Sequence, residues 1–242
     1  MSSAKSAVVT GANKGIGREV ARRLATDGFK VWLGARNAEH GARAARELRT
    51  EGLNVHWLKI DVTNDESVAS AVSTVRTESS YLDVLVNNAG VAINYDRPPS
   101  EQAIADIKAT YEVNVFGAIR VTQGFLPLLL AARAARIVMV SSHSGSIARA
   151  LDPAAPSYSV NMMGYGSSKT ALNAITVSFA KALKDRGMRV NAAAPGYTAT
   201  DLNGHKGHRT VGQAAEVIVR LATLGADGPT GGYFDDDGPV AW

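Results

Sequence analysis

The sequence of 242 residues contains no cysteine. Disulfide bonds, thiolate nucleophiles and cysteine-ligated metal or iron–sulfur centres are therefore excluded, and the composition fits a reducing compartment, so we expect a cytoplasmic protein. Long hydrophobic runs are also absent: the longest, residues 125–132, includes Pro127 and is far shorter than the roughly 20 residues of a membrane-spanning helix. The N-terminus lacks the basic and long apolar regions of a secretory signal, so we expect neither a membrane span nor export.

Charge of one sign is only slightly in excess, with 26 Lys and Arg against 22 Asp and Glu, which is too little to indicate nucleic-acid binding. No linker rich in Pro, Ser, Gly or charged residues divides the chain, so we expect one domain over residues 1–242. Basic residues concentrate in residues 14–49. Their helical spacing, as from Arg18 to Arg22 and from Arg43 to Arg46, predicts that most of them lie on solvated helix faces.

Short apolar runs alternate with amphipathic helical patterns along the chain, which is typical of repeated βα units around a buried parallel sheet. The pattern predicts a single-domain, doubly wound α/β fold of the Rossmann type, with a seven-stranded parallel sheet and helices on both faces. The predicted strands are 6–10, 30–34, 54–59, 82–86, 136–140, 189–193 and 232–234. The predicted helices are 15–26, 38–50, 65–79, 101–131 with a break, 165–185 and 211–224. The acidic run 235–237 is predicted to be a solvated turn.

A glycine-rich turn, residues 10–17, follows the first predicted strand and opens the first predicted helix. Gly11 permits the tight turn, Gly15 lets a pyrophosphate approach the backbone, and Gly17 allows close packing of helix on sheet. The helix N-terminus adds free N–H groups and a positive dipole end, so the turn predicts a dinucleotide site. The alternative is that the glycines serve only a tight turn, since their spacing differs from the commoner Gly-x-Gly-x-x-Gly. The other turn residues predicted to line the cofactor are Asn13, Lys14 and Ile16.

Arg36 ends the second predicted strand, where NAD-binding proteins place an acid on the ribose 2′-hydroxyl. A carboxylate there would repel a 2′-phosphate, whereas Arg36 can pair with it and Lys14 can add a second positive charge. The sequence therefore predicts NADP(H) in preference to NAD(H) as the cofactor.

Tyr165 is the only tyrosine followed four residues later by a lysine, Lys169, and this spacing places both side chains on one face of a helix. Such a pair arises easily by chance, so its context has to support it. A free tyrosine has a pKa near 10, and nearby positive charge from Lys169 and an oxidised nicotinamide would let it act as an acid near neutral pH.

The sequence resembles the short-chain dehydrogenase/reductase superfamily and, within it, NADPH-dependent carbonyl reductases, because it carries their motifs in the same order. The resemblance covers essentially the whole chain. Besides the glycine-rich turn and the Tyr165–Lys169 pair, it rests on five motifs: Asp61-Val62, Asn87-Asn88-Ala89-Gly90, Asn114 in Glu-Val-Asn-Val-Phe-Gly, Ser141-Ser142, and Pro195-Gly196-Tyr197-Thr198.

The resemblance implies a catalytic tetrad. Tyr165 would donate a proton to the carbonyl oxygen, and Ser142 would hydrogen-bond the same oxygen. Lys169 would bind the nicotinamide ribose and lower the tyrosine pKa, while Asn114 would hold a water that links Lys169 to solvent. The resemblance also implies cofactor contacts for Asp61 beside the adenine with Val62, for Asn88, Ala89 and Gly90 along the ribose, and for Thr198 near the carboxamide with Pro195 and Gly196.

Each of these assignments has a structural alternative. Asn114 could merely cap or kink its helix, Asp61 could be an ordinary turn residue, and Ser142 could simply end a strand. His205 and His208 lie near Asp201, but their segment is rich in glycine, so we expect no metal site.

Ser142 and Tyr165 are 23 positions apart, a longer separation than the commonest in the superfamily. The resemblance implies that the additional segment, about residues 147–160, covers a helix face used elsewhere for tetramer formation, so we expect a monomer or dimer. The segment after Gly196 is short, which predicts an open pocket for apolar, bulky carbonyl compounds. The residues predicted to line it are Val91, His143, Met162, Met163 and Tyr197.

We therefore expect reduction of a ketone or aldehyde to an alcohol by hydride transfer from NADPH, with Tyr165 as proton donor. One alternative is an NADP-dependent alcohol dehydrogenase acting in the oxidative direction. Another is a non-catalytic NADP(H)-sensing protein, which would be expected to lack the Tyr, Lys or Ser. A serine hydrolase is disfavoured because no Gly-x-Ser-x-Gly string occurs.

Overall fold

The computed structural model describes residues 5–155 and 158–242, and within them eight strands form one sheet in the order β3-β2-β1-β4-β5-β6-β7-β8. The strands are β1 (Ser6–Val9), β2 (Lys30–Ala35), β3 (Val55–Lys59), β4 (Val84–Asn87), β5 (Arg136–Val140), β6 (Arg189–Ala193), β7 (Tyr233–Asp235) and β8 (Gly238–Pro239). Neighbouring strands from β3 to β7 pair in parallel, and β8 pairs antiparallel with β7. The predicted doubly wound sheet is confirmed, with one short edge strand that the sequence pattern does not indicate.

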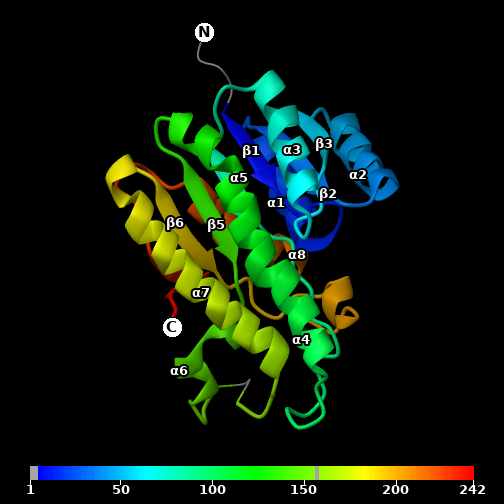
Figure 1. Cartoon of the computed structure of the whole chain (residues 1–242), viewed down its shortest axis with the longest axis vertical. Helices are drawn as coiled ribbons and strands as arrows, with labels where there is room; N and C mark the ends of the chain where they lie inside the picture. The colour runs from blue at the N-terminus through cyan, green and yellow to red at the C-terminus, as the bar shows by residue number, and fades with distance from the viewer. Residues whose placement is uncertain (1–4, 156–157) are drawn as a thin grey trace.

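Helices cover both faces of the sheet (Figure 1). They are α1 (Gly15–Thr26), α2 (Ala38–Thr50), α3 (Asp65–Glu78), α4 (Ile104–Tyr111), α5 (Ala118–Ala131), α6 (Ile147–Ala150), α7 (Met163–Leu183) and α8 (Val211–Ala222). Two large apolar clusters form most of the core of the described residues, one with α1, α2 and α8 and the other with α3, α5 and α7, and a small third cluster lies at β6 and β7. Val8 belongs to the second cluster and its neighbours Ala7 and Val9 to the first, because successive strand residues point to opposite faces.

The break predicted within residues 101–131 is a π-helical turn, Glu112–Gly117, between α4 and α5. A π-turn widens the helix locally, and such turns are frequent at functional sites. In the described residues one helical segment, Ile104–Ala131, is long and apolar enough to cross a membrane by length and composition. Half of its most apolar window is buried inside the protein, and a core helix of a soluble protein passes the same test.

Parallel pairing brings the carboxyl ends of β1, β4, β5 and β6 to one edge of the sheet. The chain order reverses at β1, which lies between β2 and β4. In open α/β sheets the crevice at such a reversal is where ligands bind, so the loops after these strands are where a site is expected.

Candidate active site

The turn between β1 and α1 has the backbone that its glycines predict. Gly11 and Gly15 have φ values of 62° and 58°, in the left-handed region that favours glycine. A Cβ atom on Gly11 would lie 2.9 Å from the Cα of Ala89, so the turn packs directly on the loop after β4. The Thr10 hydroxyl accepts hydrogen bonds of 3.0 Å from the backbone N–H groups of both Asn88 and Ala89. The two loops are thus bound to each other.

The Asn88 side chain also joins the loop after β4 to the glycine-rich turn. Its Nδ2 donates to the carbonyl oxygens of Thr10 at 2.9 Å and Gly11 at 3.1 Å. A Cβ atom on Gly17 would lie 2.3 Å from this nitrogen, so only glycine allows α1 to start this close to the loop after β4. Asn88 therefore supports the turn with its side chain.

A cavity of about 400 Å³ opens beside the turn. Asn13, Lys14 and Gly15 line it, as the sequence predicts for a cofactor site, together with four residues of α1 and α2: Arg18, Arg43, Ala44 and Glu47. Arg18 and Arg43 are solvated, as predicted, with 38% and 58% of their side chains exposed, and they also border this cavity. The sequence could not reveal this cavity, because it depends on how α2 packs beside α1.

One carboxylate, Glu47, lies between the two arginines of this cavity. Arg18 Nη2 lies 2.9 Å and Arg43 Nε 4.0 Å from the carboxylate oxygens of Glu47. With Lys14 included, three cations border the cavity against this single acid. The cavity therefore has an excess of positive charge, which suits a phosphate group.

The segment after β6 folds back over the turn. Lys14 Nζ lies 2.5 Å from Asp201 Oδ2, and a Cβ atom on Gly15 would lie 3.6 Å from Thr200 Cγ2. His205 Nε2 lies 2.7 Å from the other oxygen of Asp201. The hydrogen bond from Lys14, followed by that from His205, lowers the pKa of the Asp201 carboxyl. In residues 5–155 and 158–242 no three His, Cys, Asp or Glu side chains are grouped so that they could hold a metal ion.

Arg36 at the end of β2 is open to solvent, with 77% of its side chain exposed, and lies 4.0 Å from Asp61. Asp61 forms a turn with Thr63, whose backbone N–H and hydroxyl donate to Oδ1 at 3.0 and 2.7 Å. Burial raises the pKa of Asp61, but the Thr63 hydrogen bonds and the charge of Arg36 outweigh it, so the pKa is lowered overall. Asp61 thus acts as a turn residue, as its alternative role predicts. The Arg36 guanidinium remains accessible.

Ser142 and Tyr165 meet through their side chains, one from the end of β5 and one from the first turn of α7. Ser142 caps a short 3₁₀ turn, His143–Gly145, and a hydrogen bond joins its side chain to that of Tyr165. Burial raises the pKa of the Tyr165 phenol, the bond to Ser142 lowers it in part, and the nearby Tyr95 raises it further. Two half-buried hydroxyl groups therefore lie together, and Tyr95, which no sequence pattern indicates, lies close to them.

Lys169 is buried, with 4% of its surface exposed. Burial lowers its pKa from 10.5 to about 8. Its Nζ donates to the carbonyl oxygen of Val140 at 2.8 Å and lies 5.7 Å from the centre of the Tyr165 ring. Lys169 is predicted to lower the pKa of Tyr165, yet burial has the largest influence on that pKa and raises it.

Asn114 lies in the π-turn, and its side chain pairs with the backbone of Val91 in both directions. Val91 N–H donates to Oδ1 at 2.8 Å, and Nδ2 donates to Val91 O at 2.9 Å and to Ser168 Oγ at 3.0 Å. A Cβ atom on Gly90 would lie 3.3 Å from Asn114 Oδ1 and 3.4 Å from Lys169 Nζ. The fold therefore brings Asn114 next to Lys169, and it also ties the π-turn to the loop after β4.

The loop after β6 is folded tightly upon itself. Gly196 has a φ of 76°, and a Cβ atom there would lie 2.6 Å from Arg209 Cδ. The Thr198 hydroxyl donates to the carbonyl oxygens of Pro195 at 3.3 Å and Gly196 at 3.2 Å. Asn203 Nδ2 donates to the Thr198 carbonyl at 2.9 Å. Arg209, which no sequence motif indicates, therefore packs directly on this loop.

The residues predicted to line the substrate pocket differ in burial and in their contacts. Val91 is held by Asn114, whereas Tyr197 is exposed and its ring centre lies 6.0 Å from that of His208. His143 is mostly buried and paired with Asp235 at 2.9 Å. Met162 is half-buried and Met163 is exposed. Four apolar side chains of the long segment before α7 are exposed as well: Ile147, Leu151, Tyr158 and Val160. Residues 156–157 of the predicted insertion lie outside the described residues.

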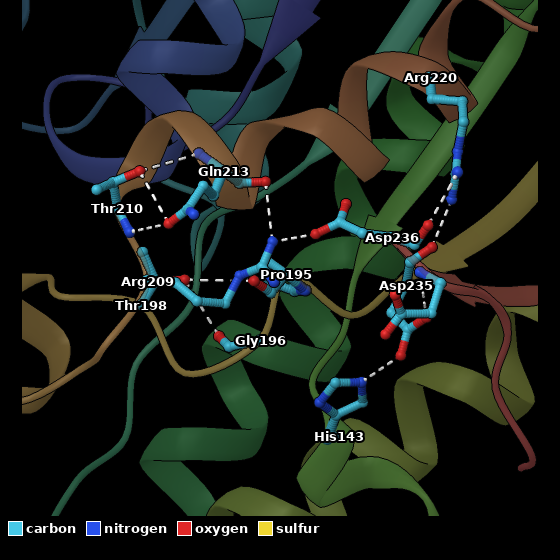
Figure 2. Close-up of polar contacts among 11 residues, drawn as sticks. His143, Pro195, Gly196, Thr198, Arg209, Thr210, Gln213, Arg220, Asp235 and Asp236 are labelled. Carbon is cyan, nitrogen blue, oxygen red and sulfur yellow. Dashed lines mark hydrogen bonds and ion pairs between the residues drawn. The ribbon is translucent and has the colours of Figure 1, made fainter.

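The acidic run 235–237 is not simply a solvated turn, so that prediction is wrong for two of its three residues. Figure 2 shows Asp235 paired with His143 and Asp236 paired with Arg209. Only Asp237 is exposed. The sequence could not reveal these pairs, because their partners are distant along the chain.

Comparison with known proteins agrees with this geometry. A family model described as short chain dehydrogenase matches residues 5–210. The chain is 35% identical over 237 residues to the short-chain dehydrogenase anuI of Penicillium roqueforti, covering 95% of this chain and 93% of that protein. Salutaridine reductase from Papaver somniferum has a TM-score of 0.83 and 28% identity, covering 96% of this chain and 99% of that one. NADPH-bound carbonyl reductase from chicken fatty liver has a TM-score of 0.85 and 26% identity, covering 99% of both chains. The chain therefore belongs to the short-chain dehydrogenase/reductase family of oxidoreductases.

Proposed function

We propose that this protein reduces a ketone or aldehyde to an alcohol with NADPH. The observation that carries the proposal is the hydrogen bond between the Ser142 and Tyr165 side chains beside the buried Lys169. A carbonyl oxygen placed at these two hydroxyl groups would receive two hydrogen bonds at once. This arrangement stabilises the negative charge that develops on the oxygen during reduction.

The residues around the turn fit a dinucleotide with a 2′-phosphate. The glycine backbone at residues 11–17 leaves room for a pyrophosphate, and Arg36 is exposed at the end of β2, where an acid would mark NAD. The cavity with Lys14, Arg18 and Arg43 adds positive charge beside the turn. The name of the carbonyl reductase from chicken fatty liver, which states that it holds NADPH, supports the same choice. When bound, this cofactor supplies the hydride.

Tyr165 would give its hydroxyl proton to the oxygen of the substrate. The phenol is protonated at neutral pH, since burial holds its pKa above the ordinary value, so the proton is available for transfer. The ammonium of Lys169, 5.7 Å from the ring centre, would stabilise the phenolate that remains. Ser142 would hold the oxygen in place through its hydroxyl. Asn114, beside Lys169, would complete the path by which the proton is replaced from solvent.

The exposed apolar side chains of the segment 147–163 support a substrate that is itself apolar and bulky. A substrate panel tests this choice of substrate class. Activity confined to small charged ketones would contradict it. Oxidation of an alcohol with NADP remains the second candidate, because the same groups catalyse both directions and the direction depends on the ratio of reduced to oxidised cofactor.

The direct test of the function is a screen of NADPH oxidation over assorted ketones, aldehydes and quinones, with NADH run in parallel. We expect turnover of at least one apolar carbonyl compound, and faster turnover with NADPH than with NADH. Tight binding of NADPH without turnover of any carbonyl or alcohol would favour the alternative of a non-catalytic, NADP(H)-sensing protein. We further propose that the protein acts in the cytoplasm, which its lack of cysteine suits.

A further inference from the structure

The carboxyl end of β7 lies beside two loops of the proposed active site. β7 pairs in parallel with β6, with Ala192 opposite Tyr233 and Ala193 opposite Phe234. Because β6 also pairs with β5, the ends of all three strands point to the same edge of the sheet. The turn 235–237 therefore emerges next to the loop that carries Ser142 and the loop that begins at Pro195.

The end of β7 holds the Ser142 loop at two neighbouring points. The Tyr233 hydroxyl donates to the carbonyl oxygen of Ser142 at 2.5 Å. Asp235 Oδ2 lies 2.9 Å from Nε2 of His143, the next residue, and both side chains are mostly buried, with 16% and 27% exposed. These contacts fix the backbone immediately after the Ser142 side chain.

Asp236 holds the second loop through Arg209. Their side chains form an ion pair in which each is about three-quarters buried, with 26% of Arg209 and 25% of Asp236 exposed. The alkyl stem of Arg209 lies against Gly196. The backbone N–H of Arg209 donates to Tyr197 O at 3.1 Å, and its backbone carbonyl accepts from Ala199 N–H at 2.9 Å. The position of Arg209 therefore sets the path of the chain from 196 to 199.

We propose that Asp235 and Asp236 are positioning residues, which hold the Ser142 loop and the 195–198 loop in register with each other. Neither carboxylate is placed at the reacting atoms; each acts through a basic side chain, His143 or Arg209 (Figure 2). This inference rests on the proposed function, which places the Ser142 loop at the substrate and the 195–198 loop at the cofactor. Asp237 offers a natural control, since in the part of the chain that the structure describes its side chain forms no hydrogen bond or ion pair.

The test compares Asp235→Asn, Asp236→Asn and Asp237→Asn in the full chain. For Asp235→Asn we expect kcat to fall about tenfold with an NADPH Kd within about twofold of the unchanged protein, because only the Ser142 hydroxyl is displaced. For Asp236→Asn we expect the NADPH Kd to rise about tenfold, because the 195–198 loop is released. Asp237→Asn should change neither quantity. Equal effects of all three substitutions, or an unchanged kcat in Asp235→Asn, would overturn the proposal.

A double-mutant cycle with His143→Ala tests whether Asp235 acts through the histidine. If it does, the double variant should lose no more activity than either single variant, whereas additive losses would refute this route. Should Asp235→Asn or Asp236→Asn fail to fold, His143→Ala and Arg209→Lys probe the same contacts from their other ends.

Hydrogen exchange gives a readout that needs no turnover. Asp235→Asn should speed amide exchange at residues 143–146, and Asp236→Asn at 197–199, each without the other. Uniform acceleration over both loops would mean that the acidic turn is merely a general stabiliser and would overturn the inference. If the unchanged protein reduces no carbonyl compound, the proposed function fails, while the exchange pattern still decides whether the turn controls the two loops separately.

Discussion

The Tyr165 hydroxyl is the group on which the proposed reaction depends. We predict that Tyr165→Phe lowers kcat by about 10²- to 10⁴-fold, the usual contribution of a general acid, because the phenol proton is lost. The NADPH Kd should stay within about twofold, since the ring remains. Fluorescence titration and steady-state rates measure the two quantities. Unchanged turnover would show that another group donates the proton.

Burial of the Lys169 ammonium costs stability. Its pKa in the folded protein is about 8, against 10.5 for an ordinary lysine, and this difference corresponds to about 3 kcal/mol at neutral pH. The unfolded chain binds more protons between these two values, so this contribution makes the protein more stable as pH rises from about 8 to 10.5. Below about 8 the full cost is present.

We therefore predict that Lys169→Met raises the free energy of unfolding at pH 7 by about 1 to 3 kcal/mol while abolishing turnover. The lower figure allows for the Val140 carbonyl, which loses its hydrogen bond to Nζ. Urea unfolding at pH 7 and pH 10 measures the effect, and the gain should be smaller at pH 10. Destabilisation at both pH values would mean that the hydrogen bond outweighs the cost of burying the charge.

Arg36 is the residue that we expect to select the cofactor. We predict that Arg36→Asp raises the NADPH Kd at least about tenfold and leaves that of NADH within about threefold, because the new carboxylate repels only the 2′-phosphate. Titration with both cofactors checks the prediction. An equal loss for the two would place Arg36 away from the phosphate.

At the scale of elements, the packing of α2 beside α1 makes part of a solvated helix face the wall of a cavity. Arg43 and Arg46 lie one turn apart on α2 and both are exposed, but only Arg43 lines this cavity. We predict that Arg43→Ala raises the NADPH Kd about three- to tenfold, as loss of a charged hydrogen bond to phosphate would. Arg46→Ala is the matched control with the same change in net charge.

Binding of 2′,5′-ADP and of 5′-AMP separates the sources of this effect. Only the former carries a 2′-phosphate, so Arg43→Ala should weaken 2′,5′-ADP alone. If both arginine variants lose affinity equally, long-range charge is the cause and the cavity has no specific role.

The strands and helices themselves follow the sequence pattern closely. The strand predicted at 136–140 is β5 (Arg136–Val140), and the helix predicted at 15–26 is α1 (Gly15–Thr26). Where the ends of other elements differ, they do so by one to three residues, as in α7, which begins at Met163 and not at 165. Apolar periodicity defines such elements well because it reports burial of one face, whereas their ends depend on local capping.

At the scale of the whole molecule, the length and position of the segment before α7 bear on assembly. The segment carries exposed apolar side chains, among them Leu151 and Tyr158. The resemblance to carbonyl reductases leads us to expect that it covers a helix face that other members use to form tetramers. We predict a monomer or dimer in solution. Size-exclusion chromatography with light scattering should give one or two times 25.4 kDa. A mass of four chains would contradict the prediction.

The sequence alone determined the class of fold, the glycine-rich turn and the Tyr165–Lys169 pair, because each is a local pattern whose spacing maps directly onto a strand, a turn or a helix. Only the tertiary structure decided which distant side chains meet. The pairing of Asp235 with His143, the cavity beside Arg43 and the hold of Asn114 on Val91 all join residues from different elements. Such contacts depend on how the elements pack against one another, and neither periodicity nor residue spacing along the chain contains that information.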